Sequence, residues 1–289
     1  MHVKDSPLHD QWALILGASS GFGEATALEL ARAGMHIFGV HLDRRATVKN
    51  VERIVSRIQA SGRKAQFFNV NAADPERRAE VISQIEARLL QEGGPAVLRV
   101  FMHSLAFGTL KTFIGESARD MMSAAQLNMT LEVMANSLVY WTQDLVSHSL
   151  LGDGSRIFAM TSAGDFKVIP SYGGISGAKA ALEAYIRQLA VELAHRGVTA
   201  NAIRAGVTDT PALQKILYLV GLMTRDDHNV AGSGHGQGGP YHMFDQGETA
   251  CLMQYLCLAR LHARARSGRK NHNCRVWFHP MKIVAALRR

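Results

Sequence analysis

Apolar runs of strand length alternate with helix-length amphipathic segments between Trp12 and about Ile216. The strand signals lie at 13–16, 36–40, 65–70, 97–102, 156–160 and 199–203. Between them, helical composition and spacing mark 24–33, 48–60, 76–90, 124–147 and 174–195. Strands separated by helices of this length form βαβ units, because a parallel partner strand can only be reached by a crossover connection. The pattern therefore predicts a single-domain α/β fold, a doubly wound parallel sheet with helices on both faces.

A glycine-rich segment, Gly17-Ala-Ser-Ser-Gly21-Phe-Gly23, joins the first strand to the first helix. Glycines permit a tight turn and let the backbone approach a pyrophosphate, while the free N–H groups of the helix N-terminus attract the anion. The segment predicts a dinucleotide site on a Rossmann-type sheet. The residues expected to contact the dinucleotide are Gly17, Ser19, Ser20, Gly21, Phe22 and Gly23. The alternative is a glycine-rich turn that binds nothing.

The end of the second strand, near His41, indicates which dinucleotide binds. An acid at this place hydrogen-bonds the ribose 2′-OH and repels a 2′-phosphate. The nearest acid, Asp43, comes two residues later and is followed by Arg44 and Arg45, whose guanidinium groups can clamp a 2′-phosphate. We therefore expect NADPH, with His41, Arg44 and Arg45 in its site. Two alternatives stay open: the arginines are only a solvated helix start, or Asp43 reaches the ribose and NADH binds.

Tyr172 and Lys179 form a candidate catalytic pair after the fifth strand. Their separation of seven residues is almost two helical turns, so both side chains can share one face. A nearby ammonium group favours the ionised form of a tyrosine, and we expect Lys179 to lower the pKa of Tyr172 in this way. Taken singly, a surface tyrosine and a solvated helix lysine are the plain alternatives.

Several motifs now resemble the short-chain dehydrogenase/reductase family, from Trp12 to about Lys215. The glycine spacing G-x-x-x-G-x-G is the form found in that family. Most members have Tyr-x-x-x-Lys, whereas Tyr-x₆-Lys is similar to the enoyl-acyl carrier protein reductases within it. The segment His103-Ser-Leu-Ala-Phe107 resembles their H-S-I-A-F, and Ala205-Gly-Val-Thr-Asp-Thr210 matches their A-G-P-I-R-T turn in position.

The resemblance implies a reaction and a set of site residues. Hydride would pass from the nicotinamide to the β-carbon of an enoyl thioester, and Tyr172 would hydrogen-bond the oxygen on which enolate charge develops. Lys179 would position the tyrosine and hold the nicotinamide ribose, and Asn128 would have a supporting structural role. Further cofactor contacts are expected from Asn69, Val70, His103, Ser104, Leu105, Lys179, Gly206, Thr208 and Thr210.

One position departs from many enoyl reductases. They carry a second tyrosine ten residues before the first, where this chain has Ser162. Serine is the usual family residue after the fifth strand, where it supports the substrate carbonyl, so Ser162 joins the expected catalytic set. Two other functions stay open: a carbonyl reductase of the same family, and a dinucleotide-binding protein without turnover. The expected substrate is a small-molecule acyl thioester, carried on acyl carrier protein or coenzyme A.

Composition adds expectations about location and partners. No apolar run approaches the ~20 residues that span a bilayer, and the first ten residues are too polar for a signal peptide. We expect a cytoplasmic protein without a membrane partner, assembled as a homotetramer or homodimer like its family. The net charge of +8 comes mostly from residues 221–289, with 10 Lys/Arg against 4 Asp/Glu. Nucleic acid is therefore not an expected partner of the nearly neutral body.

The chain changes character near residue 220. We expect residues 1–220 to form the reductase domain with the start of a substrate lid, and 221–289 to be an atypical basic segment. That segment lacks the Asp-Gly-Gly with which family members end their last strand. It contains all three cysteines, whose spacing matches no standard metal site, so no metal is expected. The segment could bind an acidic partner, or it is the product of a shifted reading frame, which sequencing the gene across the codons for 216–221 would test.

Overall fold

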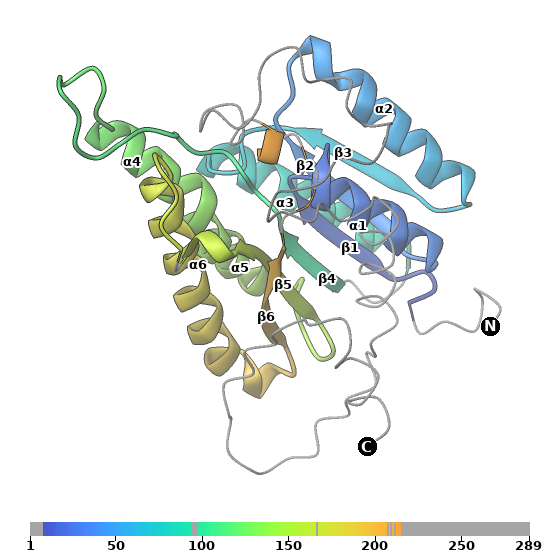
Figure 1. Cartoon of the computed structure of the whole chain (residues 1–289). Helices are drawn as coiled ribbons and strands as arrows, with labels where there is room; N and C mark the ends of the chain where they lie inside the picture. Colours follow the sequence, from blue (N-terminus) through green and yellow to red (C-terminus); the bar gives the residue numbers. More distant parts are fainter. Residues whose placement is uncertain are drawn as a thin grey trace, which may run out of the picture.

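The computed structural model describes residues 8–93, 97–165, 167–206, 208, 210 and 212–214. Within them, a parallel sheet has the strand order β3-β2-β1-β4-β5-β6, as Figure 1 shows. The strands are β1 (Trp12–Leu16), β2 (His36–His41), β3 (Ala65–Asn69), β4 (Leu98–His103), β5 (Arg156–Ser162) and β6 (Thr199–Ala205). This is the order of dinucleotide-binding sheets, and it confirms the predicted fold class. The change of character predicted near residue 220 lies outside the described residues.

The helices alternate with the strands as the periodicity predicts. They are α1 (Gly21–Arg32), α2 (Arg45–Ala60), α3 (Pro75–Gln91), α4 (Ala124–Leu131), α5 (Ser137–Ser147) and α6 (Gly173–Glu192). Short turns of helix lie at η2 (Glu132–Asn136), η3 (Ala163–Asp165) and η4 (Ala194–Arg196). None of the described helices is long and apolar enough to span a bilayer.

The single helix predicted over 124–147 is α4 and α5 joined by the π-helical turn η2. In this turn the Ser137 hydroxyl donates to the Val133 carbonyl at 2.8 Å and also meets the ring of His103 at 2.9 Å. π turns inside α-helices are uncommon and are frequent at functional sites. Apolar periodicity cannot reveal such a turn, because one extra residue per turn barely shifts the pattern.

The two faces of the sheet bury alternate residues of each strand. On β1, Leu14 and Leu16 join the core beneath α3, α5 and α6, whereas Ala13 and Ile15 join the core beneath α1 and α2. This follows from the two-residue period of a strand. Because the strands are parallel and covered on both faces, all their carboxyl ends lie at one edge of the sheet, where the loops gather.

Trp141 is the largest fully buried side chain on α5. Its indole N–H donates to the carbonyl of Ala72 at 2.8 Å and so ties α5 to the segment between β3 and α3. A buried carbonyl left without this donor would incur a desolvation cost.

We predict that Trp141→Phe lowers the free energy of unfolding by about 2–4 kcal/mol, because it opens a cavity and leaves the Ala72 carbonyl without its donor. Urea denaturation followed by circular dichroism measures the change. Val191→Ala, at a side chain 61% exposed on α6, is the matched control and should change stability little. Equal unfolding midpoints for Trp141→Phe and the unchanged chain would contradict the prediction.

Candidate functional site

The glycine-rich loop lies at the switch point between β1 and β4. Gly17 has φ +83°, and a Cβ atom there would stand 2.5 Å from the carbonyl oxygen of Ser104. At Gly23 a Cβ atom would stand 2.0 Å from the Gly17 carbonyl. Glycine is therefore required at both places by close backbone approach. The loop brings β1, α1 and the end of β4 into direct contact.

The same loop fits the phosphates of a dinucleotide. Ser20 is the N-cap of α1, and its side chain makes no capping hydrogen bond, so the first N–H groups of this helix remain available to an anion. Among the described residues, a Cβ atom added at Gly21 would meet the side chain of Thr210, at 3.5 Å, and no other. Thr210 thus lies beside the loop, as the resemblance implies for a pyrophosphate contact. The Thr210 hydroxyl accepts from the Leu213 amide at 3.2 Å.

Asp43, the acid nearest the end of β2, is held by its own neighbours. Its carboxylate lies 3.0 Å from the His41 ring nitrogen Nδ1. Burial would raise the pKa of Asp43, but hydrogen bonds from Thr47, Ser19 and His41 together hold it below the ordinary value. The Asn69 side chain also bonds the Asp43 amide and carbonyl, at 2.9 and 3.0 Å. Val70 continues this edge, with its amide donating to the carbonyl of His41 at 2.8 Å.

Arg44 and Arg45 occupy the start of α2, three residues earlier than predicted. Both are exposed, and within the described part of the chain neither forms a salt bridge.

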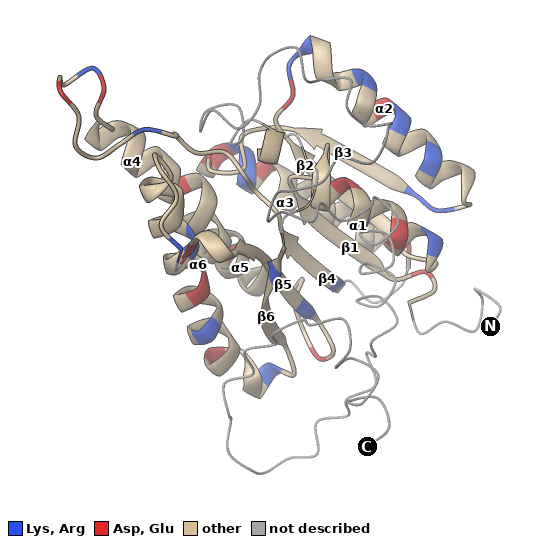
Figure 2. Cartoon of the chain, viewed as in Figure 1, with Lys and Arg blue, Asp and Glu red and all other residues tan. Residues whose placement is uncertain are grey.

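Figure 2 shows further Lys and Arg residues along α2. The two arginines therefore lie at a solvated helix start, which is the alternative to a phosphate site that the sequence left open. This position also places two cations and a helix N-terminus beside the end of β2, which suits a phosphate.

Tyr172 is the N-cap residue of α6 and is 7% exposed. Its side chain hydrogen-bonds that of Ser162, the last residue of β5. The Ser162 hydroxyl also accepts from the Gly164 amide at 3.2 Å. A Cβ atom at Gly164 would stand 2.4 Å from the tyrosine ring, so the backbone of η3 packs against that ring.

The expected effect of Lys179 on Tyr172 is wrong. Burial raises the pKa of Tyr172, and the hydrogen bond from Ser162 only partly opposes it. Lys179 is directed elsewhere: its ammonium donates to the carbonyls of Met160 at 2.8 Å and Leu105 at 3.3 Å. Both side chains face the carboxyl end of β5, but the lysine bridges β5 to the segment after β4. Burial lowers the pKa of Lys179 to about 8, so it remains mostly charged at neutral pH.

His103, at the end of β4, is fully buried. Burial and the charge of Lys179 lower its pKa to about 3, so its ring is neutral. Because the Ser137 hydroxyl proton is directed to Val133, we assign a proton to the His103 Nε2 atom facing Ser137. The ring therefore anchors η2, while Ser104 and Leu105 present their carbonyls to Gly17 and Lys179.

Three other predicted site residues make few contacts within the described part of the chain. Asn128 is exposed on α4, and its side chain makes no hydrogen bond within the described part of the chain. Gly206 is exposed after β6, and the Thr208 hydroxyl lies 3.4 Å from its carbonyl oxygen.

The apolar residues that lie beside Tyr172 were not predicted from the sequence to be part of the site. A Cβ atom at Gly173 would stand 2.5 Å from the Phe113 ring, and one at Gly174 would stand 2.7 Å from the Met122 methyl group. The sequence feature that could have identified them is the presence of aromatic and methionine residues in a segment without strand or helix periodicity. Three more apolar side chains close to Phe113 or Tyr172 in the chain are exposed: Phe107 at 60%, Ile114 at 85% and Val168 at 100%.

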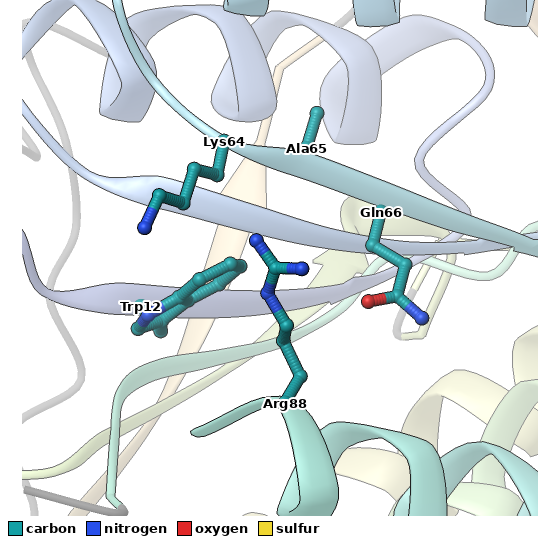
Figure 3. Close-up of a pocket in the computed structure, with 5 residues that line it drawn as sticks. All are labelled: Trp12, Lys64, Ala65, Gln66 and Arg88. Carbon is teal, nitrogen blue, oxygen red and sulfur yellow. The ribbon is translucent and has the colours of Figure 1, made fainter. Parts of the chain in front are cut away.

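A pocket of about 370 Å³ lies away from this site, at the amino ends of β1 and β3. Figure 3 shows its lining residues, Trp12, Lys64, Ala65, Gln66 and Arg88. Both of its cations, Lys64 and Arg88, form salt bridges with Glu92. Within the described residues, no group of three or more His, Cys, Asp or Glu side chains could hold a metal ion. The cysteines lie outside those residues.

Replacement of Lys179 should change how the stability of the protein depends on pH. The folded pKa of about 8 lies below the ordinary 10.5, so the unfolded chain binds more protons between these values and unfolding becomes harder as pH rises. We predict that the stability of the unchanged chain, relative to Lys179→Met, rises by about 2–3 kcal/mol across that window. Urea denaturation of both proteins over this range measures it, and a difference independent of pH would contradict it.

Comparisons with known proteins agree with this geometry. A family model described as enoyl-(acyl carrier protein) reductase matches residues 17–230. The 1-cyclohexenylcarbonyl-CoA reductase of Streptomyces collinus is 28% identical over 221 residues, which are 76% of this chain and 73% of that protein. The 3-oxoacyl-[acyl-carrier-protein] reductase of Synechocystis sp. is 30% identical over 207 residues, 71% of this chain and 77% of that protein.

A solved structure is also similar to this chain. A short chain dehydrogenase from Burkholderia cenocepacia J2315, in complex with NADP, is 26% identical with a TM-score of 0.58, and the match covers 71% of this chain and 77% of that one. Together with the strand order and the match of the family model over most of the sequence, these relatives show that the chain belongs to the short-chain dehydrogenase/reductase family of oxidoreductases.

Proposed function

We propose that this protein reduces the C=C bond of an enoyl thioester with NADPH. The observation that carries the proposal is the arrangement at the start of α6. Tyr172 is buried against Ser162, and Lys179, seven residues later, bridges the end of β5 to the segment after β4. The spacing is that of enoyl reductases rather than of the wider family. The Streptomyces relative, named for a reductase of an unsaturated acyl-CoA, supports the same substrate class.

The chain's own residues supply the cofactor site. The loop from Gly17 to Gly23, with the N-terminus of α1, would hold the pyrophosphate. Arg44 and Arg45 would hold the 2′-phosphate, because Asp43 is occupied by its neighbours and does not compete for the ribose. Lys179 uses two of its three N–H donors on carbonyls and has the third for the nicotinamide ribose. When bound, NADPH supplies the hydride.

Tyr172 acts as a hydrogen-bond donor at the substrate oxygen. Its raised pKa keeps the hydroxyl protonated at neutral pH. Ser162 orients it, and the tyrosine stabilises negative charge as that charge develops on the thioester oxygen. Phe113 and Met122, packed over the first residues of α6, provide apolar surface for the acyl chain. We propose a thioester of acyl carrier protein or coenzyme A as the substrate.

A carbonyl reductase is the second candidate, and Ser162 favours it. This serine holds Tyr172 in the manner expected for support of a substrate carbonyl. The Synechocystis relative, named as a 3-oxoacyl reductase, supports this alternative. Both reactions use the same donor and differ in which substrate carbon receives the hydride.

We predict that the protein oxidises NADPH with crotonyl-coenzyme A and that Tyr172→Phe lowers kcat about a hundredfold or more, because the hydrogen bond to the developing charge is lost. Absorbance of the reduced nicotinamide measures the rate. The matched control is Tyr185→Phe on the same helix, whose hydroxyl bonds Asn136 at 3.1 Å. Turnover of acetoacetyl-coenzyme A alone would establish the second candidate, and cofactor binding without turnover of either thioester would refute both.

Cofactor choice gives a separate prediction. Removing the two guanidinium groups in Arg44→Ala/Arg45→Ala should raise KM for NADPH by about tenfold or more and leave KM for NADH little changed, because charge-assisted hydrogen bonds to the 2′-phosphate are lost. Steady-state rates with each cofactor test this. Lys49→Ala, an exposed cation further along α2, is the control. An equal loss for both cofactors would show that the arginines do not select the 2′-phosphate.

A further inference from the structure

Three charged side chains meet beneath the loop that carries Ser162. Arg204 on β6 donates through one guanidinium nitrogen to Asp165 in η3 and to Glu183 on α6, both at 2.6 Å. Thr161 on β5 donates to the same Glu183 oxygen at 3.0 Å. The side chains of Asp165, Glu183 and Arg204 are 9%, 15% and 24% exposed. Arg204 therefore joins β6 to η3 and α6, and Glu183 extends the connection to β5.

The cluster is connected to Tyr172 through the backbone. Thr161 and Arg204 are register partners on neighbouring strands, so Arg204 lies one register position before Ser162. Asp165 ends η3, whose Gly164 packs on the Tyr172 ring and donates its amide to the Ser162 hydroxyl. The Gly164 carbonyl accepts from Ser176 on α6. A shift of Asp165 would thus move both contacts that orient the tyrosine.

Charge balance makes Arg204 necessary for this arrangement. Burial and a hydrogen bond with Glu183 raise the pKa of Asp165, so these two carboxyl groups are close enough to compete for a proton. Glu183 is stabilised as an anion by Arg204, Asp165 and Thr161, which hold its pKa below the ordinary value against burial. Without the guanidinium, two partly buried carboxylates would repel each other, and η3 would separate from α6.

We propose that Arg204 is a positioning residue for the reaction: through Asp165 and Glu183 it holds η3 against α6 and so aligns Ser162 and Tyr172. The inference rests on the proposed reductase function only through Tyr172, and it applies equally to an enoyl or a carbonyl substrate. None of the three charged side chains needs to touch substrate or cofactor.

The test compares the unchanged chain with Arg204→Met, Asp165→Asn and the double variant. Arg204→Met should lower kcat about tenfold or more through misalignment, with KM for NADPH little changed. The double variant should recover most of kcat, because the isosteric amide removes the repulsion and can still bond Glu183. Arg63→Met, which breaks the ion pair of Arg63 with the exposed Asp10 at 2.6 Å, is the control for loss of an ion pair elsewhere.

Each variant is assayed with both crotonyl- and acetoacetyl-coenzyme A, so the inference is judged on whichever thioester reacts. Hydrogen exchange at the amides of Ala163–Asp165, measured without substrate, gives a second readout that needs no turnover. Faster exchange in Arg204→Met that the double variant reverses supports the proposal even if neither thioester reacts. The proposal is overturned if Arg204→Met leaves both kcat and exchange unchanged, or if the double variant is as impaired as Arg204→Met.

Discussion

A buried ammonium group holds the site together. Lys179 on α6 donates to a carbonyl on β5 and to another just after β4, where it is only 6% exposed. Burying a charge is costly, and hydrogen bonds offset part of that cost. The lysine therefore draws α6 onto the strand ends and leaves one N–H for a ligand. The cost of its burial appears as the lowered pKa of about 8.

The ionisable side chains near this cation are either neutral or hydrogen-bonded. His103 is neutral beside it and serves as a hydrogen-bond donor to Ser137, the first residue of α5. Burial raises the pKa of Tyr172 further above neutral pH, which agrees with the hydrogen-bond donor role that we propose for it. At the other end of the cofactor site, Asp43 is charged but bonded on several sides. The exposed arginines after it are thus the groups best placed to meet an added anion.

Sequence reasoning predicted much of the site, and its errors have physical causes. The seven-residue separation directed attention to Tyr172 and Lys179, whose catalytic role stays a prediction, and the glycine pattern correctly indicated a close-packed loop after β1. The sign of the Tyr172 pKa shift was wrong because spacing along a helix says nothing of what else binds the lysine. The helix start at Arg45 was missed because the three residues before Val48 include no large apolar side chain. Phe113 and the Arg204 cluster lie in contacts between segments far apart in the chain, which no local pattern reports.

The sequence by itself determined the order of strands and helices and the close-packed glycine loop, because these follow from periodicity and from the absence of a side chain. Only the tertiary structure decided the state of the polar groups. Whether Asp43 is free or held, whether Tyr172 is made more or less acidic, and which carboxylates Arg204 joins all depend on burial and on partners brought from other elements. Burial and pairing are properties of the packed sheet and its helices, so they arise only once the strand ends meet.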